Sequence, residues 1–356
     1  MSAPTLTRPT ATETRVPVLR LGSLVALHWR RRAVLVCLAM LGVGLVASLL
    51  TLTVGELGIP LRELPGVLTG NGSRAQEWVL RTNRLPRLLV GALAGAAFGV
   101  AGSIFQSVTR NPLGSPDVIG LGAGAAAGAA AASLIWPGVV PTSVGALIGA
   151  GIAIAAVYLG SGRGFSAPYR MVVTGIAVGA MALAFVQLAL ARATREDAFV
   201  MAAWLNGSLA SRRWSDVTLV AVALVVLIPA ALLLTRRLQL MEMGDDAATG
   251  LGVDPTRTRN LAVGVAVLLT AAAVTVSGPV AFVALTAPQI ARRLTRSSGP
   301  GMIAAACTGA TVLVVADLLA QRLPFGVQYP VGVVTAGLGG IYLAFLLIRE
   351  WRRGAV

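Results

Sequence analysis

Long uncharged apolar runs alternate with short polar connections along most of the chain. A bilayer core takes about 20 helical residues to cross, and runs of that length recur from residue 33 onward. Pro and Gly in Trp136–Ser143 divide the longest run, because both residues break helices. The pattern therefore predicts an all-α, polytopic membrane protein with about ten transmembrane helices. These are Ala33–Val54, Leu88–Thr109, the two halves of Val118–Gly162, Met171–Ala191, Val217–Thr235, Leu261–Ser277, about Val280–Thr295, Met302–Ala320 and Val331–Ile348.

The polar ends of the chain lie outside these spans. Residues 1–32, rich in Thr, Pro and Arg, predict a flexible N-terminal tail; residues 33–350 predict one transmembrane domain, and residues 351–356 a short C-terminal tail. An even number of spans puts both tails on one side. If that side is the cytoplasm, the inner segments hold 19 of the 29 basic residues and the outer segments 10. The positive-inside rule therefore predicts cytoplasmic termini in the inner membrane.

Composition excludes several classes of function. Charged residues make up 12% of the chain, whereas soluble domains carry about a quarter. The net charge of +15 does not indicate nucleic-acid binding, because the charges stand at the ends of apolar runs. Every basic residue is Arg, so the chain lacks the lysine of a phosphate-binding loop. One histidine and two cysteines, both inside apolar runs, leave no His/Cys metal site or Ser-His-Asp triad, and we expect no cofactor.

Glycines recur at four-residue spacing in two of the predicted spans. The positions are Gly91, Gly95 and Gly99 in one span, and Gly120, Gly124 and Gly128 in the other. In lipid, small residues at this spacing allow helix backbones to approach closely, which favours a packing role. A glycine-lined path for a substrate is the alternative.

A compact polar turn joins these two glycine-rich segments. Asn111 and Pro112 end one helix, because the residue before a proline is pushed out of the helical region. The sequence Ser115-Pro116-Asp117 then begins the next, with Ser as the N-cap and Pro at the first position. We predict a short, stiff hairpin on the cytoplasmic side.

The motif around this turn resembles a known family. "RLPRLLVGALAGAAFGVAGSIFQSVTRNPLGSPDVIGLGAGA" (Arg84–Ala125) is similar to the signature of the FecCD family, the permease subunits of ABC importers for ferric siderophores, haem and cobalamin. The similarity continues in family order at Met243–Arg259, Gly278–Leu294, Ala316–Asp317 and Pro330–Gly340, and spans roughly residues 33–350. The chain departs from the family pattern at three glutamines. Gln289 stands where His is common, Gln321 precedes an arginine, Arg322, that is shifted from its usual place after Ala-Asp, and Gln328 lies near the position of a usual Glu.

The resemblance implies a BtuC-like permease fold and a transport role without catalysis in this chain. A ferric siderophore is the implied cargo, with haem or cobalamin as alternatives. The implied partners are an ABC ATPase subunit, a second permease (a copy of itself or a paralogue), an extracytoplasmic siderophore-binding protein and the lipid bilayer.

The longest cytoplasmic connection, residues 236–260, is the candidate contact with the ATPase. Asp245 and Asp246 suit the start of a short helix, and Gly250 and Gly252 suit its end. This segment resembles the coupling helices of the family, whereas an ordinary solvated loop is the alternative. The candidate coupling residues are Gly244, Asp245, Asp246, Ala247, Ala248, Leu251 and Gly252.

Two further candidate sites concern charges near the outer face. Arg62 and Arg74 lie away from span ends, and the family implies that they contact an acidic surface of the binding protein; anchoring at the membrane interface is the alternative. Asp317 is the one carboxylate well within a predicted span. Ionisable groups at membrane depth usually have a partner, and Arg322 is a candidate.

Two other classes of function compete with an ABC permease. A transporter driven by an ion gradient needs ionisable groups at mid-membrane, whereas these spans are nearly free of charge. An intramembrane enzyme needs a cluster of acid, base or nucleophile that the chain does not offer.

Overall fold

The computed structural model describes residues 18–21, 25–28, 31–54, 58–162, 164–323 and 329–354, and these are predominantly helical. The helices are α1 (Arg31–Thr53), α2 (Leu64–Thr69), α3 (Arg74–Trp78), α4 (Leu85–Thr109), α5 (Leu121–Ala130), α6 (Thr142–Gly160), α7 (Pro168–Arg192), α8 (Arg195–Leu205), α9 (Trp214–Met241), α10 (Asp245–Gly250), α11 (Pro255–Ser277), α12 (Val283–Thr295), α13 (Met302–Arg322) and α14 (Val331–Gly354). Short 3₁₀ turns occupy Pro116–Ile119 and Gly164–Ser166, and wider π-helical turns occupy Val79–Arg84 and Ala131–Ile135.

Each of the ten predicted spans coincides with a helix, which confirms the all-α membrane fold. Among the described residues, eight helices are long and apolar enough to cross a bilayer. The two others are the stretch Leu121–Ile135 and α12. Helix α12 is short because the chain leaves the helical conformation after Ser277: Gly278 and Phe282 have φ values of 70° and 68°.

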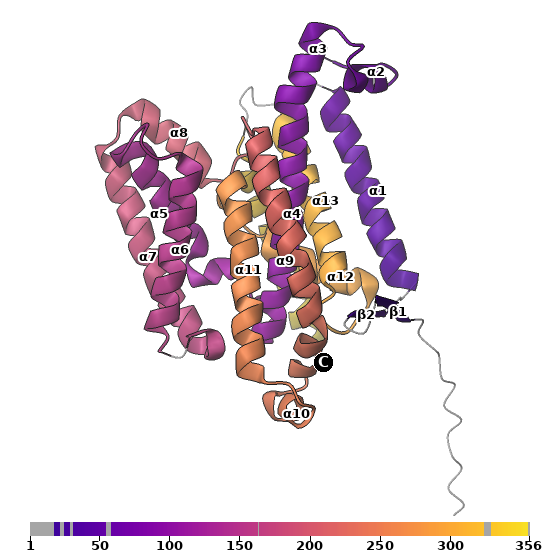
Figure 1. The fold of residues 1–356 in the computed structure, drawn as a ribbon, viewed down its shortest axis with the longest axis vertical. Helices are drawn as coiled ribbons and strands as arrows, with labels where there is room; N and C mark the ends of the chain where they lie inside the picture. The colour runs from indigo at the N-terminus through magenta and orange to yellow at the C-terminus, as the bar shows by residue number, and fades with distance from the viewer. Residues whose placement is uncertain are drawn as a thin grey trace, which may run out of the picture.

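Helix α4 occupies the centre of the bundle (Figure 1). It packs against α9, α11, α12 and α13, while α5, α6 and α7 form a second group that joins the first through α11. The main core consists largely of small and β-branched side chains, with Phe98 and Phe105 of α4 as its largest members. Small side chains let the helices lie close together, so packing at short range takes the place of large interdigitating residues.

Five of the six glycines with four-residue spacing lie where backbones meet, whereas Gly91 faces the Leu209 side chain. A Cβ atom on Gly99 would stand 2.1 Å from the carbonyl oxygen of Ala305 on α13, and one on Gly95 would stand 2.4 Å from that of Gly309. Gly128 faces Gly145 of α6 in the same way, at 2.0 Å. Gly124 likewise faces α6, whereas Gly120, with φ of 75°, lies against Gly175 and Gly179 of α7. These distances leave no room for a side chain.

Arginines cap the C-terminal ends of neighbouring helices. The last-turn carbonyls of a helix have no partner within it and carry its negative dipole end. Guanidinium groups from elsewhere in the chain donate to them at five helix ends. The pairs are Arg84 with Leu52 and Arg322 with Val54 (α1), Arg81 with Leu68 (α2), Arg110 with Met241 (α9), Arg212 with Val276 (α11) and Arg32 with Leu294 (α12).

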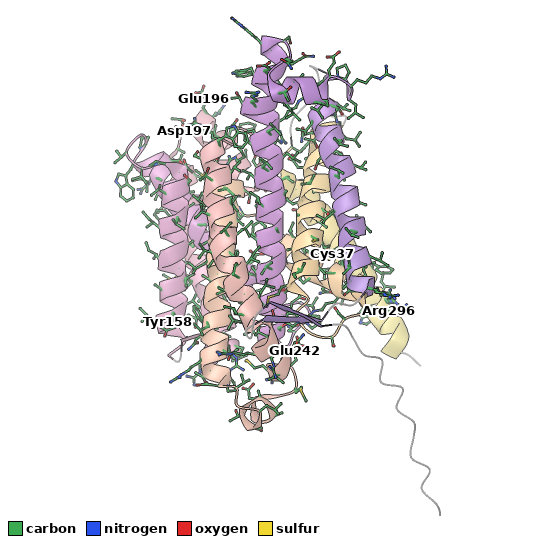
Figure 2. The ribbon with its side chains drawn as sticks, turned by 45° about the vertical axis from the view of Figure 1, so that its right-hand side comes forward. Cys37, Tyr158, Glu196, Asp197, Glu242 and Arg296 are labelled. Atoms are coloured by element: carbon green, nitrogen blue, oxygen red, sulfur yellow. The ribbon has the colours of Figure 1, made fainter. Side chains whose placement is uncertain are left out.

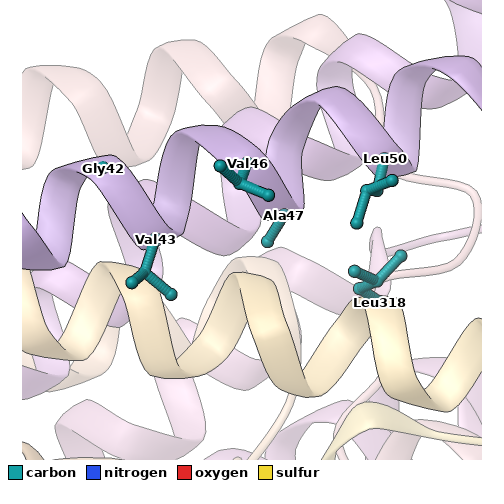
Figure 3. A pocket seen from close by; sticks show the side chains of 6 residues that line it. All are labelled: Gly42, Val43, Val46, Ala47, Leu50 and Leu318. Carbon is teal, nitrogen blue, oxygen red and sulfur yellow. The ribbon is translucent and has the colours of Figure 1, made fainter.

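Helix α1 is the least embedded of the long helices. It lies along α13, to which Thr311 Oγ1 ties it by donating to the carbonyl oxygen of Met40 at 2.8 Å. A shallow apolar groove of about 360 Å³ runs between the two helices (Figure 3). Its walls are Gly42, Val43, Val46, Ala47, Leu50 and Leu318. Outside the groove, α1 exposes Leu35, Leu38, Leu41 and Leu45, which suits contact with lipid.

The predicted terminal tails contain regular structure in their described parts. Strands β1 (Val18–Leu21) and β2 (Val25–His28) pair antiparallel, with Val18 opposite His28. The remainder of the predicted N-terminal tail, except Arg31 and Arg32 at the start of α1, lies outside the described residues. Helix α14 continues to Gly354, so most of the predicted C-terminal tail extends the last span.

Replacing Gly99 by Ala should destabilise the bundle, because the new Cβ would collide with backbone on α13. Overpacking of a tight core costs about 1–3 kcal/mol. Gly91→Ala is the matched control on the same helix, since its Cβ would meet only the end of the Leu209 side chain, at 3.0 Å. In one detergent, the unfolding midpoint of G99A should fall well below that of G91A; equal midpoints would contradict the close approach of α4 and α13.

Candidate functional site

The predicted site residues separate to the two ends of the bundle. Arg62 lies just before α2, and Arg74 is the first residue of α3. These two helices lie at one end of the bundle, and α10 lies at the other (Figure 1). Strands β1 and β2 and the marked C-terminus lie toward the α10 end. In Figure 2, Glu196 and Asp197 mark the first end and Glu242 the second. The two candidate protein-binding surfaces are therefore separated by the full length of the transmembrane helices.

Helix α10 has the boundaries that its sequence indicates. Gly244 precedes it with φ of 119°, and Gly252 follows it with φ of 80°, conformations that residues with a side chain rarely adopt. Asp245 and Asp246 stand in the first turn, at the positive end of the helix dipole. The amide of Val253 donates to the carbonyl oxygen of Ala248 at 3.0 Å and closes the end. The segment is a short helix with a sharp turn on each side.

The two alanines of α10 point in different directions. Ala248 is fully buried in the main core of this chain. Ala247 is exposed, as are Met243 and Leu251, whose exposed fractions are 69% and 58%. The outward surface of the segment is therefore formed by Met243, Ala247 and Leu251, and Ala248 holds the helix against the bundle.

Asp245 joins α10 to two transmembrane helices. Its carboxylate accepts hydrogen bonds from Arg259 of α11, at 3.1 and 3.2 Å, and from Arg110 at the end of α4. Partial burial acts to raise the pKa of Asp245, but the hydrogen bonds and positive charges of Arg259 and Arg110 outweigh it and hold that pKa below its usual range. Asp245 therefore carries its negative charge at neutral pH.

A second polar cluster lies beside the first, at the cytoplasmic-side ends that the sequence predicts for α4, α9 and α12. Ser107 Oγ donates to Glu242 Oε1 at 2.9 Å and accepts from Arg292 at 3.0 Å. Arg292 and Glu242 also form an ion pair at 3.7 Å. Sequence reasoning missed Ser107, Arg110, Glu242, Arg259 and Arg292, because their proximity depends on how four separate helices end.

The predicted hairpin after α4 is held by its own side chains and by α12. Asn111 Oδ1 accepts from the amide of Leu113 at 2.9 Å, and Ser115 caps the 3₁₀ turn by accepting from the amide of Asp117. Gln289, one of the departures from the family pattern, donates to the carbonyl oxygen of Pro112. Gln289 therefore binds the turn to α12. Gln328 lies outside the described residues.

Asp317 has a partner at membrane depth, but it is Arg87 of α4 and not Arg322. The Arg87 guanidinium donates to both carboxylate oxygens, at 2.8 and 2.9 Å, and both side chains are buried. Gln321, a second departure from the family pattern, donates to the same carboxylate at 2.8 Å from the next turn. Arg322 instead reaches Val54 at the end of α1. A buried charge is costly without such pairing, so this arrangement accounts for an acid within a span.

The outer candidates stand on a compact pair of short helices. Ser73 and Gln76 form a reciprocal cap at the start of α3, with hydrogen bonds of 3.3 and 3.0 Å. Gln76 also donates to Glu63 at 3.1 Å, which ties α3 to the chain before α2. Arg62 and Arg74 are exposed there. Neither makes a side-chain hydrogen bond or ion pair within the described part of the chain.

Nothing in the described residues assembles a metal site: no three His, Cys, Asp or Glu side chains come together in a way that could hold an ion. The two ends present exposed side chains, Arg62 and Arg74 at one and Met243, Ala247 and Leu251 at the other.

Comparisons with known proteins agree with this architecture. The sequence model of the FecCD transport family matches residues 40–349. The ferric enterobactin transport system permease protein FepG of Escherichia coli (strain K12) is 41% identical over 324 residues, covering 91% of this chain and 98% of the relative. The Fe(3+)-citrate import system permease protein YfmE of Bacillus subtilis (strain 168) is 35% identical, covering 91% of this chain and 98% of the relative.

A solved structure shares the fold. It is described as an inward-facing conformation of a putative metal-chelate type ABC transporter, and it matches with a TM-score of 0.77 at 23% identity. The match covers 88% of this chain and 99% of that chain. With a family match across most of its length, and with relatives aligned from end to end, this chain belongs to the FecCD transport family.

Proposed function

We propose that this chain is the membrane-spanning permease subunit of an ABC importer that carries a ferric siderophore across the cytoplasmic membrane. The observation that carries the proposal is the match over nearly the whole chain to permeases named for ferric enterobactin and Fe(3+)-citrate. The bundle supports it, because the long helices are apolar and Asp317, the one buried carboxylate among the described residues of the spans, is paired with Arg87. An ion-gradient transporter would need further ionisable groups there.

In this proposal the chain performs no chemistry of its own. A separate ATPase subunit binds and hydrolyses ATP, and its closure shifts the permease between conformations that open to opposite sides. The permease acts as a dimer, with a second copy or a paralogue, and the cargo passes between the two.

The surface formed by Met243, Ala247 and Leu251 is the proposed contact with the ATPase. It combines exposed apolar side chains with a short helix that projects beyond the ends of the spans (Figure 1). Exposed apolar residues outside the bilayer are typical of protein-binding surfaces. Gly244 and Gly252 set the projection of this helix, and Asp246 contributes an exposed charge beside it.

The proposed orientation places α10 and both termini in the cytoplasm, and α2 and α3 outside. The excess of arginines in the inner segments supports it. Arg62 and Arg74 would then face an extracytoplasmic binding protein, whose acidic groups they would attract.

Uptake by the reconstituted importer tests the function and the cargo together. Proteoliposomes with the ATPase and binding protein should accumulate labelled ferric siderophore in an ATP-dependent way, and should not accumulate haem or cobalamin. Uptake of haem or cobalamin in place of siderophore would change the proposed cargo.

A substitution on α10 tests the contact with the ATPase. Leu251→Asp should weaken ATPase binding at least about tenfold, because a charge enters an apolar contact. Parent-level assembly and uptake by L251D would remove α10 from the ATPase contact.

Charge reversal tests the outer surface. Arg62→Glu and Arg74→Glu should each weaken capture of the cargo-loaded binding protein, more strongly at low salt, where surface charges are least screened. ATPase binding should remain at the parent level because that contact is at the other end. If binding-protein affinity is the same in both variants as in the parent, these arginines serve only the membrane interface.

Single-cysteine labelling tests the orientation. In a background with Cys37 and Cys307 replaced by Ser, a membrane-impermeant maleimide should label Arg74→Cys in sealed cells, and Ala247→Cys only after permeabilisation. Ala247 is chosen because it is exposed, whereas Ala248 is buried. Labelling of position 247 in sealed cells would reverse the proposed orientation.

A further inference from the structure

We infer that Asp245 is a positioning residue which, through its ion pairs with Arg110 and Arg259, makes α4 and α11 move with α10. The inference rests on the proposed function, since it assumes that an ATPase displaces α10. It goes further by naming the contacts through which that displacement reaches the membrane. The Asp245 clamp, as we call it, consists of Arg110, Asp245 and Arg259.

The clamp adds charged contacts between elements that also pack on one another, since α10 touches α9 and α11, and α4 packs against α11. Asp245 is the first residue of α10, Arg110 follows the last residue of α4, and Arg259 lies in the first turns of α11. The side chain of Arg259 is only 8% exposed, so it is fixed within the bundle, whereas the Asp245 side chain is 46% exposed. The half-exposed Asp245 carboxylate therefore lies between the buried guanidinium of Arg259 and the more exposed guanidinium of Arg110. It connects α10, at the surface, to the helices of the core.

The backbone at Arg110 indicates that its side chain is needed. Arg110 ends α4 in the left-handed conformation, with φ of 50°, where Gly or Asn is the less strained choice. Its guanidinium makes two contacts from that position: it donates to the carbonyl oxygen of Met241 at 2.9 Å and to Asp245. One residue therefore holds the end of α9 and the start of α10 to the end of α4.

The turn before α10 is anchored a second time to the same helix. Glu242, three residues before Asp245, accepts from Ser107 of α4 and pairs with Arg292 of α12. Both sides of the Met243–Gly244 turn are thus bound to α4 through polar contacts. A push on Met243 or Leu251 cannot move α10 far without moving α4 or breaking these contacts.

Helix α4 is suited to transmit such a movement. It contacts α9, α11, α12 and α13, and its Gly95 and Gly99 meet the backbone of α13 without intervening side chains. Tightly packed helices shift as bodies rather than deform, because interfaces of this kind have few intermediate arrangements. The clamp therefore acts where a small displacement has the largest effect on the bundle.

The charges predict what happens when the carboxylate is removed. Asp245 separates two guanidinium groups that both approach its Oδ1 atom. In Asp245→Asn they would repel each other, and α10 would lose its ion pairs with Arg110 and Arg259 while Met243, Ala247 and Leu251 remain exposed. ATPase binding should survive, and ATP hydrolysis should become separated from transport.

The experiment measures cargo transported per ATP hydrolysed in proteoliposomes of the complete importer, normalised to assembled complex. D245N should lower this ratio about fivefold or more, within the usual range of coupling between sites, with ATPase binding near the parent level. Asp245→Glu, which keeps the charge, should restore most of the ratio. Asp254→Asn is the matched control, because it removes a carboxylate whose exposed ion pair with Arg257 stays within α11, and it should lower the ratio less than twofold.

Three outcomes would overturn the inference. The first is a D245N importer that keeps the parent ratio; the second is D245N losing the ATPase as L251D does, which would make Asp245 part of the contact itself. Failure of the proposed function is distinguishable, because the parent importer itself would then show no ATP-dependent siderophore uptake. Failure of the proposed α10 contact would appear as full assembly and transport in L251D. A ratio lowered equally by D245N and D254N would assign the effect to loss of any carboxylate near α10 and would also count against the clamp.

Discussion

The close approach of α4 and α13 is the constraint on which the rest of the bundle depends. Backbone meets backbone at Gly95 and Gly99, and no side chain fits between them. This contact places Arg87 of α4 against Asp317 of α13 at one end, and it sets where the ends of α4 and α12 meet at the other. In a bilayer, where lipid is as apolar as leucine, such close packing supplies cohesion that the hydrophobic effect does not.

Polar contacts are concentrated at the ends of this packed centre. Asp317 is neutralised near the end with α2 and α3, whereas Asp245 and Glu242 engage arginines at the end with α10. The length between them is held mainly by contacts that carry no charge. Among the described residues, the charge buried within a span is therefore a paired one, which lowers its cost in the membrane.

The sequence predicted the helices well because each span needs about 20 apolar residues, a signal that does not depend on tertiary contacts. It also placed the boundaries of α10, since Asp245 and Asp246 are typical of a first helical turn and Gly250 and Gly252 of a helix end. It could not distinguish the two alanines of α10: Ala248 is buried only because α10 folds back onto the bundle. The predicted partner of Asp317, Arg322, was wrong for a similar reason. The observed partner, Arg87, lies 230 residues away in the chain. The span that contains α12 was predicted to begin at about Val280, before its observed start at Val283, since apolar composition continues through the non-helical turn at Gly278 and Phe282.

The arginines that cap helix ends change how the basic composition is understood. A genome rich in G and C would favour arginine over lysine everywhere, yet at these positions the guanidinium has a chemical use. Arg110 spans two acceptors at once, a carbonyl and a carboxylate, through different nitrogens of one planar group. A lysine has one short ammonium and could not span both in that geometry. Replacement of these arginines by lysine, often treated as conservative, would therefore weaken contacts between helices in this protein while leaving its net charge the same.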